Sequence, residues 1–199
     1  MMPLRIFEER YRQMLDDVLV QDRMFVIARE REDVLAEEVD QELPYNIATV
    51  GLVRISKKHD DGTSFVLLQG LHRVRINSIS QEEPYRILDI EPLDTVVEET
   101  VSEVRTQIIK SLETNSKLGG LASEEILEML SPLDDPCSFV DIAAHHICRD
   151  TDDKQDMLEQ ESLHKRAQLL LSIINAENEK LSFFNQTLGE KGQDDIDSN

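Results

Sequence analysis

The chain has 199 residues, of which 40% are hydrophobic and 5% aromatic, and it carries a formal net charge of −20. This length and apolar fraction suit one large domain or two small ones with a packed core, which excludes a chain that is disordered throughout. The negative charge disfavours nucleic acid and anionic membranes as partners, because an acidic surface repels both.

Residues 8–21 are predicted to form a helix, because apolar side chains recur there at helical spacing along one stripe. A short apolar run at 24–28 predicts a strand. The stretch 30–42 holds seven acids and one base, and we expect it to be a solvated loop. The apolar stripe of the helix consists of Tyr11, Met14, Leu15, Val18 and Leu19.

A block of strands is predicted next. The runs 47–55 and 64–69 flank Asp60-Asp61-Gly62, a turn signal in which glycine accepts a positive φ, so they predict a hairpin. Residues 72–79 alternate between apolar and polar, as expected for a strand with one wet face. A further strand is predicted at 85–91, closed by Pro92. Strands joined by such short turns predict a twisted antiparallel sheet or a small barrel.

From residue 95 the period becomes helical. The first predicted helix breaks at 118–120, a second opens at Ser123, and a third starts at Asp135-Pro136, since proline fits the first helical turn. A long helical stretch over 152–188 is predicted to be interrupted near 161–162. The apolar stripe of the first of these predicted helices consists of Val97, Val101, Val104, Ile108 and Leu112.

The sequence therefore predicts an α+β protein with three parts. Residues 1–94 are expected to form a β-rich part with one helix, and residues 95–188 an all-α bundle. The polar, acidic residues 189–199 are expected to be a disordered tail.

Two cysteines, Cys137 and Cys148, form no Cys-x-x-Cys pair and no disulfide framework for a chain of this size. Charged residues within the first twelve positions leave no room for a signal-peptide core. The longest uncharged apolar stretches are too short to span a bilayer. We therefore expect a soluble, cytoplasmic protein.

Several stretches, in this order and at this spacing, form a specific pattern. They are Pro3 to Met14 ("PLxIFExRYxxM"), Val50 to Ile55, the hairpin and strand from Asp61 to Ile76, Pro84-Tyr85, and, in the helical half, Asp141 to Ala143, Lys154 to Glu159, and Arg166. Together they resemble the N-terminal substrate-recognition (LON) domain of the Lon proteases, from residue 3 to about residue 180.

The resemblance implies a β-rich pseudo-barrel joined to a helical bundle, in stand-alone form. It also implies a role, because in full-length Lon this region helps to recognise unfolded or damaged substrates. The family's signature normally follows a first strand and a short turn, whereas this chain begins inside it at Met1. We expect the true start to lie upstream.

No catalytic motif of the Lon ATPase or protease is found. Gly119-Gly120 is followed by Leu121, with no lysine to reach a phosphate. Ser162 and Lys165 have the Ser-x-x-Lys spacing of some acyl-transfer enzymes, but the partner motifs are missing. We expect Ser162 to cap a helix, and we predict that the chain is not an enzyme and needs no cofactor.

Asp141, His145 and Cys148 fall on one broad face of a predicted helix, and such side chains together can bind zinc. An apolar stripe runs beside them, so the alternative is a core helix with a small buried thiol, which we favour. We therefore assign no metal ligand.

Arg73 and Arg75 point outward from their predicted strand, with Arg54 nearby. They could bind an acidic peptide or phosphate, but salt bridges on a wet sheet face are the favoured reading. Glu8 and Arg10 are expected to pair locally. The aromatic residues Phe7, Tyr11 and Tyr85 are expected to be core residues.

We hypothesise that the chain is a non-catalytic module that binds unfolded or exposed apolar polypeptide segments, in a groove or by strand addition at a sheet edge. One alternative is a metal-dependent hydrolase around Asp141, His145 and Cys148. Another is a scaffold that self-associates through its C-terminal helices, whose apolar residues are Leu158, Leu163, Leu169, Leu170, Ile173 and Ile174.

Overall fold

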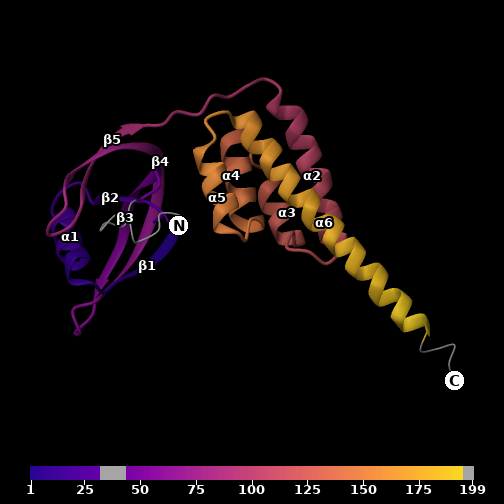
Figure 1. Ribbon diagram of the computed structural model, residues 1–199, viewed down its shortest axis with the longest axis horizontal. Helices are drawn as coiled ribbons and strands as arrows, with labels where there is room; N and C mark the ends of the chain where they lie inside the picture. The colour runs from indigo at the N-terminus through magenta and orange to yellow at the C-terminus, as the bar shows by residue number, and fades with distance from the viewer. Residues whose placement is uncertain (32–43, 195–199) are drawn as a thin grey trace. The chain divides into compact units, whose positions relative to one another are not determined.

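The structure is a computed structural model, and it describes residues 1–31 and 44–194. It contains two compact units, Met1–Asp94 and Thr95–Asn199. Figure 1 shows strands in the first unit and helices in the second, so the predicted α+β class is confirmed. The predicted acidic loop lies outside the described residues from position 32 onward.

The N-terminal unit is a five-stranded antiparallel sheet with one helix. Its strands run in the order β1-β4-β3-β2, and β5 pairs with the far part of β4. The elements are β1 (Met2–Ile6), α1 (Glu9–Leu19), β2 (Met24–Ile27), β3 (Ile47–Lys58), β4 (Ser64–Gln81) and β5 (Ile87–Pro92).

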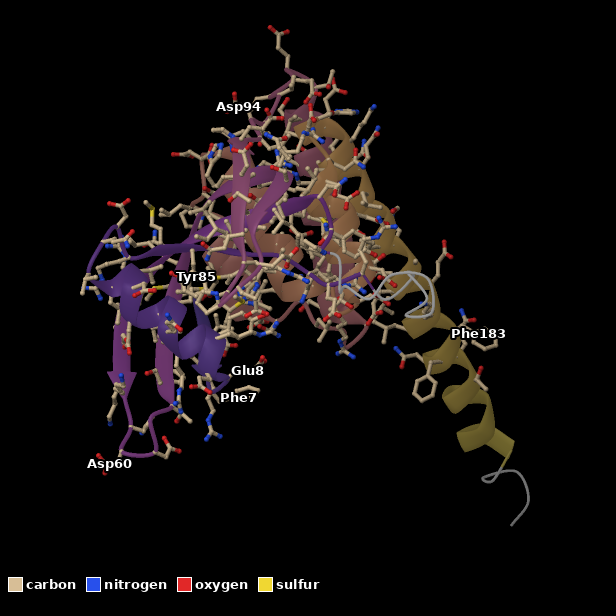
Figure 2. The ribbon with its side chains drawn as sticks, turned by 60° about the vertical axis from the view of Figure 1, so that its left-hand side comes forward. Phe7, Glu8, Asp60, Tyr85, Asp94 and Phe183 are labelled. Carbon is tan, nitrogen blue, oxygen red and sulfur yellow. The ribbon has the colours of Figure 1, made fainter. Side chains whose placement is uncertain are left out.

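The predicted turn between β3 and β4 is confirmed. Gly62 has a φ of +80°, and the Asp61 carboxylate accepts hydrogen bonds from the backbone N–H and the hydroxyl of Thr63, at 2.9 and 2.7 Å. Figure 2 shows Asp60 at the tip of this hairpin. The prediction of two strands separated near Gly70 was wrong, because β4 runs through Gly70 without a break. Instead of ending there, the strand shifts its register against β3 at Val50/Gly51 and again at Val53/Ile55.

Helix α1 covers the core of the N-terminal unit. Leu15 is fully buried, and the residues that share this core are Ile6, Val53, Val66 and Leu68. Phe7 and Tyr11, however, are 61% and 37% exposed, so their prediction as core residues was wrong. Phe7 lies at the corner between β1 and α1, where Figure 2 shows it beside Glu8.

The C-terminal unit is a helical bundle. Ser123 accepts a hydrogen bond from the backbone N–H of Ile126, and Asp135 from that of Ser138, so both predicted helix starts are confirmed. Val97 was predicted to belong to the apolar stripe of the first helix of this unit, but that was wrong: it lies before the helix and is 56% exposed. The helices are α2 (Val101–Lys117), α3 (Glu124–Leu130), α4 (Pro136–Ile147), α5 (Thr151–Glu159) and α6 (Leu163–Asp194).

The longest helix, α6, continues to Asp194, past the expected boundary near residue 188. Figure 1 shows it running beyond the ends of the other helices of its unit. Leu163, Leu170 and Ile174 are completely buried against α2 and α4. Burying a side chain of this size contributes roughly 1.5–3 kcal/mol, so these residues stabilise the chain's own bundle.

A polar network lies between α2 and α6. The Asn115 side chain donates to Asn178 Oδ1 at 2.9 Å and accepts from the backbone N–H of Ala122 at 3.0 Å. Asn178 in turn donates to the Ser111 carbonyl at 2.9 Å, and the Ser111 hydroxyl donates to Asn175 at 2.6 Å. Buried polar groups that are satisfied in this way specify one packing of the two helices.

Candidate functional site

A groove with a volume of about 220 Å³ opens on the N-terminal unit. Its lining comes from α1, from β2, from the residues that follow β2 or precede β3, from the segment between β4 and β5, and from the start of β5. The lining residues are Arg10, Tyr11, Met14, Val26, Ala28, Glu30, Pro44, Glu82, Tyr85, Arg86 and Leu88.

Helix α1 contributes Tyr11 and Met14, which share a face because they are three residues apart. The Arg10 guanidinium lies over the Tyr11 ring, 4.6 Å from its centroid, and Arg10 Nε donates to Glu8 Oε2 at 2.9 Å. The expected local pairing of Glu8 with Arg10 is therefore confirmed. It orients the guanidinium across the aromatic ring.

The segment that leads into β5 contributes Tyr85, and β5 itself contributes Leu88. The Tyr85 hydroxyl donates a hydrogen bond of 2.7 Å to Asp17 Oδ2 on α1, and this bond to a carboxylate raises the pKa of Tyr85. Arg86 Nε donates to Glu82 Oε2 at 3.0 Å. Tyr85 is half-buried, with its hydroxyl bonded to α1, so it joins two sides of the groove.

The groove combines apolar side chains with charged ones, of which Arg10, Glu82 and Arg86 have ion-pair partners. Tyr11, Met14, Val26 and Leu88 offer apolar surface, whereas Arg86 is engaged within its own segment. None of the described lining residues is a serine, cysteine, histidine or lysine. Such a surface suits the apolar side chains of a bound ligand.

Asp141, His145 and Cys148 are not brought together. Asp141 accepts a hydrogen bond of 2.8 Å from Arg166, whereas His145 is exposed. Cys148 is buried with its Sγ 3.8 Å from the Met157 sulfur, and burial raises the pKa of its thiol to about 11. Within residues 1–31 and 44–194, no group of three or more His, Cys, Asp or Glu residues could hold a metal ion.

Ser162 caps α6, as expected. Its hydroxyl accepts from the backbone N–H of Lys165 at 3.1 Å and donates to Glu98. Glu98 also accepts from the backbone N–H of His164 at 3.0 Å. Both hydrogen bonds lower the pKa of Glu98, and the bond from Ser162 has the larger effect. Glu98 thus acts as a carboxylate from outside the helix that helps to cap its N-terminus.

The three arginines of the predicted basic stripe are each engaged on the sheet. The sheet register places Arg73 and Arg75 opposite one end of β3, while Arg54 lies toward its other end, so the stripe is not continuous. The contacts are Arg54 Nε to Gln69 Oε1 at 2.6 Å, Arg73 Nη2 to the Asp94 carbonyl at 3.3 Å, and Arg75 Nε to Glu91 Oε1 at 3.4 Å.

The sequence did not reveal the groove, because its lining comes from distant parts of the chain and carries no shared motif. Tyr85, for example, lies 68 residues after Asp17. One signal was present: Tyr11 and Met14 extend the apolar stripe of α1 beyond the part that contacts the sheet.

Among the described helices, none is both long and apolar enough to cross a bilayer.

Comparisons with known proteins agree on one family. The family profile described as "ATP-dependent protease La (LON) substrate-binding domain" matches residues 1–176. The Lon protease of Brevibacillus choshinensis is 31% identical over 180 residues, which are 89% of this chain and 23% of that protein. The Lon protease of Escherichia coli K12 is 27% identical over 177 residues, 88% of this chain and 22% of that protein.

Solved structures share the fold. The N-terminal domain of a Mycobacterium avium complex Lon protease superposes with a TM-score of 0.67 at 14% identity, covering 87% of this chain and 90% of that one. A Lon N-terminal domain protein from Xanthomonas campestris gives a TM-score of 0.60 at 15% identity, covering 86% and 88%. The chain thus matches whole N-terminal domains but spans less than a quarter of the full-length proteases.

Proposed function

Since this chain belongs to the LON substrate-binding domain family, we propose that it is a non-catalytic module that binds exposed apolar segments of other polypeptides. The observation that carries the proposal is the groove, which is lined by Tyr11 and Met14 of α1 and by Leu88 of β5. Burial of apolar surface is the main driving force when an unfolded segment binds. Such segments are exposed in unfolded chains and hidden in folded ones.

The charge of the chain supports a polypeptide partner over nucleic acid. A net charge of −20 opposes the approach of phosphate backbones. Arg86, the guanidinium that the segment after β4 brings to the groove, is already paired with Glu82. The two free cysteines fit a reducing compartment, and we propose that the protein acts in the cytoplasm.

Binding of an unfolded protein tests the proposal. The probe is fluorescently labelled α-lactalbumin, reduced and carboxamidomethylated so that it stays unfolded, with the native disulfide-bonded form as control. We expect saturable binding of the unfolded form alone, measured by anisotropy, and no shortening of the probe on a gel. No saturable binding at low and moderate salt would contradict the proposal.

A matched pair of variants locates the binding surface. Met14→Glu places a carboxylate in the groove, and we expect affinity to fall about tenfold or more, equivalent to about 1.4 kcal/mol. Val20→Glu adds the same charge just after α1, at a position that is 84% exposed and outside the groove. It should leave affinity unchanged, and an equal loss in both variants would point to charge rather than to the groove.

A further inference from the structure

A second open groove lies in the helical unit, along the line where α2 and α6 run side by side (Figure 1). It has a volume of about 480 Å³, and we call it the α2–α6 seam. Four residues of each helix line the seam, at the spacings of a single helical face. They are Gln107, Lys110, Ser111 and Thr114 of α2, and Leu171, Asn175, Asn178 and Glu179 of α6.

The two helices run parallel along the seam. From Thr100 with His164 at one end to Leu118 with Asn185 at the other, hydrogen-bonded partners stay 63 to 67 residues apart. A helix rises about 1.5 Å per residue, so the lining residues extend over about 10–12 Å. An extended chain advances about 3.3 Å per residue, so three to four residues of it match this length.

Internal hydrogen bonds form the floor of the seam. Asn178 is 9% exposed, and its Nδ2 donates to the carbonyl and to the hydroxyl of Ser111, at 2.9 and 3.1 Å. The Ser111 hydroxyl donates to Asn175 Oδ1 at 2.6 Å. Asn175 is therefore held by its oxygen, and both N–H donors of its Nδ2 group are left for other partners.

Two exposed amides of the seam keep unused hydrogen-bonding groups. Among the described residues, no hydrogen bond is found for Asn175 Nδ2 or for the side chain of Gln107. An amide NH2 group donates and an amide oxygen accepts. Each peptide unit of a polypeptide offers one N–H donor and one C=O acceptor, so these side chains are complementary to a main chain.

The seam is neutral, although the whole chain carries a net charge of −20. Its two charged lining residues, Lys110 and Glu179, have opposite signs, and Leu171 is its one apolar residue. Such a lining gives no net attraction to an ion and little surface for an apolar side chain. It suits a ligand that is neutral and polar along its length, as a polypeptide main chain is.

We propose that the α2–α6 seam binds the main chain of an extended polypeptide through the side-chain amides of Gln107 and Asn175. The inference rests on the proposed function, to which it adds a second contact, on the helical unit. Main-chain groups are the same in every sequence. The seam therefore binds regardless of sequence, whereas the groove of the N-terminal unit selects apolar side chains.

The side-chain amide signals in nitrogen-15 NMR spectra of the unaltered chain test this binding mode. The probe is an acetylated and amidated peptide of four Gly-Ser repeats, which has neither charge nor an apolar side chain. We expect the signals of Gln107 and Asn175 to shift saturably during the titration. The signal of Gln168, which is exposed on α6 outside the seam, should stay in place.

A modified probe separates the main chain from the side chains. The same peptide with every glycine replaced by sarcosine keeps its carbonyls and serines but loses half of its N–H groups. We expect it to bind about fivefold more weakly or worse, as for the loss of one or more hydrogen bonds. Equal affinities of the two peptides would overturn main-chain recognition.

A matched pair of variants gives an independent measurement. Gln107→Leu removes an exposed amide of the seam, and Gln168→Leu makes the same change outside it. We expect affinity for the Gly-Ser peptide to fall about fivefold or more for Gln107→Leu and to be unchanged for Gln168→Leu. Equal losses would contradict the proposal. The titrations of the unaltered chain remain decisive even if Gln107→Leu fails to fold.

The outcomes separate the two levels of the proposal. If the unaltered chain binds unfolded α-lactalbumin but not the Gly-Ser peptide, the α2–α6 seam is not a main-chain site, while the polypeptide-binding function stands. If it binds neither probe, both proposals are wrong. Equal shifts of the Gln107 and Asn175 signals with trehalose would make the seam a sugar site. Shifts with protein concentration alone would place a second copy there, and either result would refute the inference.

Discussion

The hydroxyl of Tyr85 donates a hydrogen bond of 2.7 Å to Oδ2 of Asp17, joining the segment before β5 to helix α1. Both elements line the groove, so this contact fixes its width. A polypeptide-binding surface gains affinity when its shape is set before the ligand arrives.

Removal of this hydroxyl should loosen the groove. We expect Tyr85→Phe to lower the free energy of unfolding by about 1.5–3 kcal/mol, as for a hydrogen bond to a charged group, and to weaken binding of unfolded α-lactalbumin. Urea unfolding and anisotropy measure the two effects. Tyr11→Phe is the control for the unfolding measurement, because no hydrogen bond of the Tyr11 hydroxyl is found among the described residues. Equal losses in both variants would refute the role of the contact.

Arg166 should be the most sensitive charged residue of the helical unit. It is 3% exposed and bonds to Asp141, to the Gln160 carbonyl at 3.0 Å and to Thr95 at 3.3 Å. Asp141→Ala leaves its buried charge without a carboxylate, and we expect a loss of roughly 2–4 kcal/mol in urea unfolding.

The double variant of this pair separates the contact from general damage. Arg166→Met removes the buried charge itself, so adding Asp141→Ala to it should cost little more. Full additivity of the two losses would show that Asp141 and Arg166 do not act together.

Gly51 is a position at which a methyl group cannot fit. A Cβ there would lie 2.2 Å from Cδ2 of the buried Leu68, whereas at Gly70, also in a strand, it would meet Thr49 at 3.6 Å. We expect Gly51→Ala to destabilise the protein by about 1–3 kcal/mol. Gly70→Ala should be neutral or stabilising by up to about 1 kcal/mol. Thermal unfolding compares the two, and similar melting temperatures would contradict the prediction.

Cys148 should resist alkylation in the folded protein. With its pKa raised to about 11, less than about 1% of the thiol is ionised at pH 8.5, where an ordinary cysteine is about half ionised. In a Cys137→Ser variant, iodoacetamide labelling should therefore be slow and should accelerate on unfolding in urea. Rapid labelling without urea would show that the thiol is accessible and ionised.

The Glu98 cap should make stability depend on pH in the acid range. Its folded pKa lies below the ordinary value of 4.5, chiefly because of the Ser162 hydrogen bond. The stabilisation is therefore present above pH 4.5 and is lost as the pH falls through the lowered folded pKa. Melting temperatures of the unaltered chain and of Glu98→Gln should differ at pH 7 and converge as the pH falls through the lowered folded pKa. A constant difference would rule out the carboxylate charge as the cause.

Local chemistry was sufficient to predict several element boundaries. Ser123 and Asp135 accept hydrogen bonds from backbone N–H groups three residues further along the chain, and Gly62 forms a turn by its own positive φ. These helix caps and this turn could therefore be predicted from the sequence. The exposure of Tyr11 could not, because it depends on which face of α1 meets the sheet, and that of Phe7 depends on how the chain turns between β1 and α1. The groove could not be predicted either, since Met14, Val26 and Leu88 become neighbours only after folding.

The amides of Asn115 and Asn178 have a mechanical consequence. Sliding α6 along α2 by one turn would break their mutual bond and the bond from Asn178 to the Ser111 carbonyl before any replacement could form. A force along the axis of α6 therefore meets a discrete barrier, unlike the smoother slip of two apolar surfaces. Tension on this helix would be passed to α2 with little lengthening, up to the load at which the amides separate.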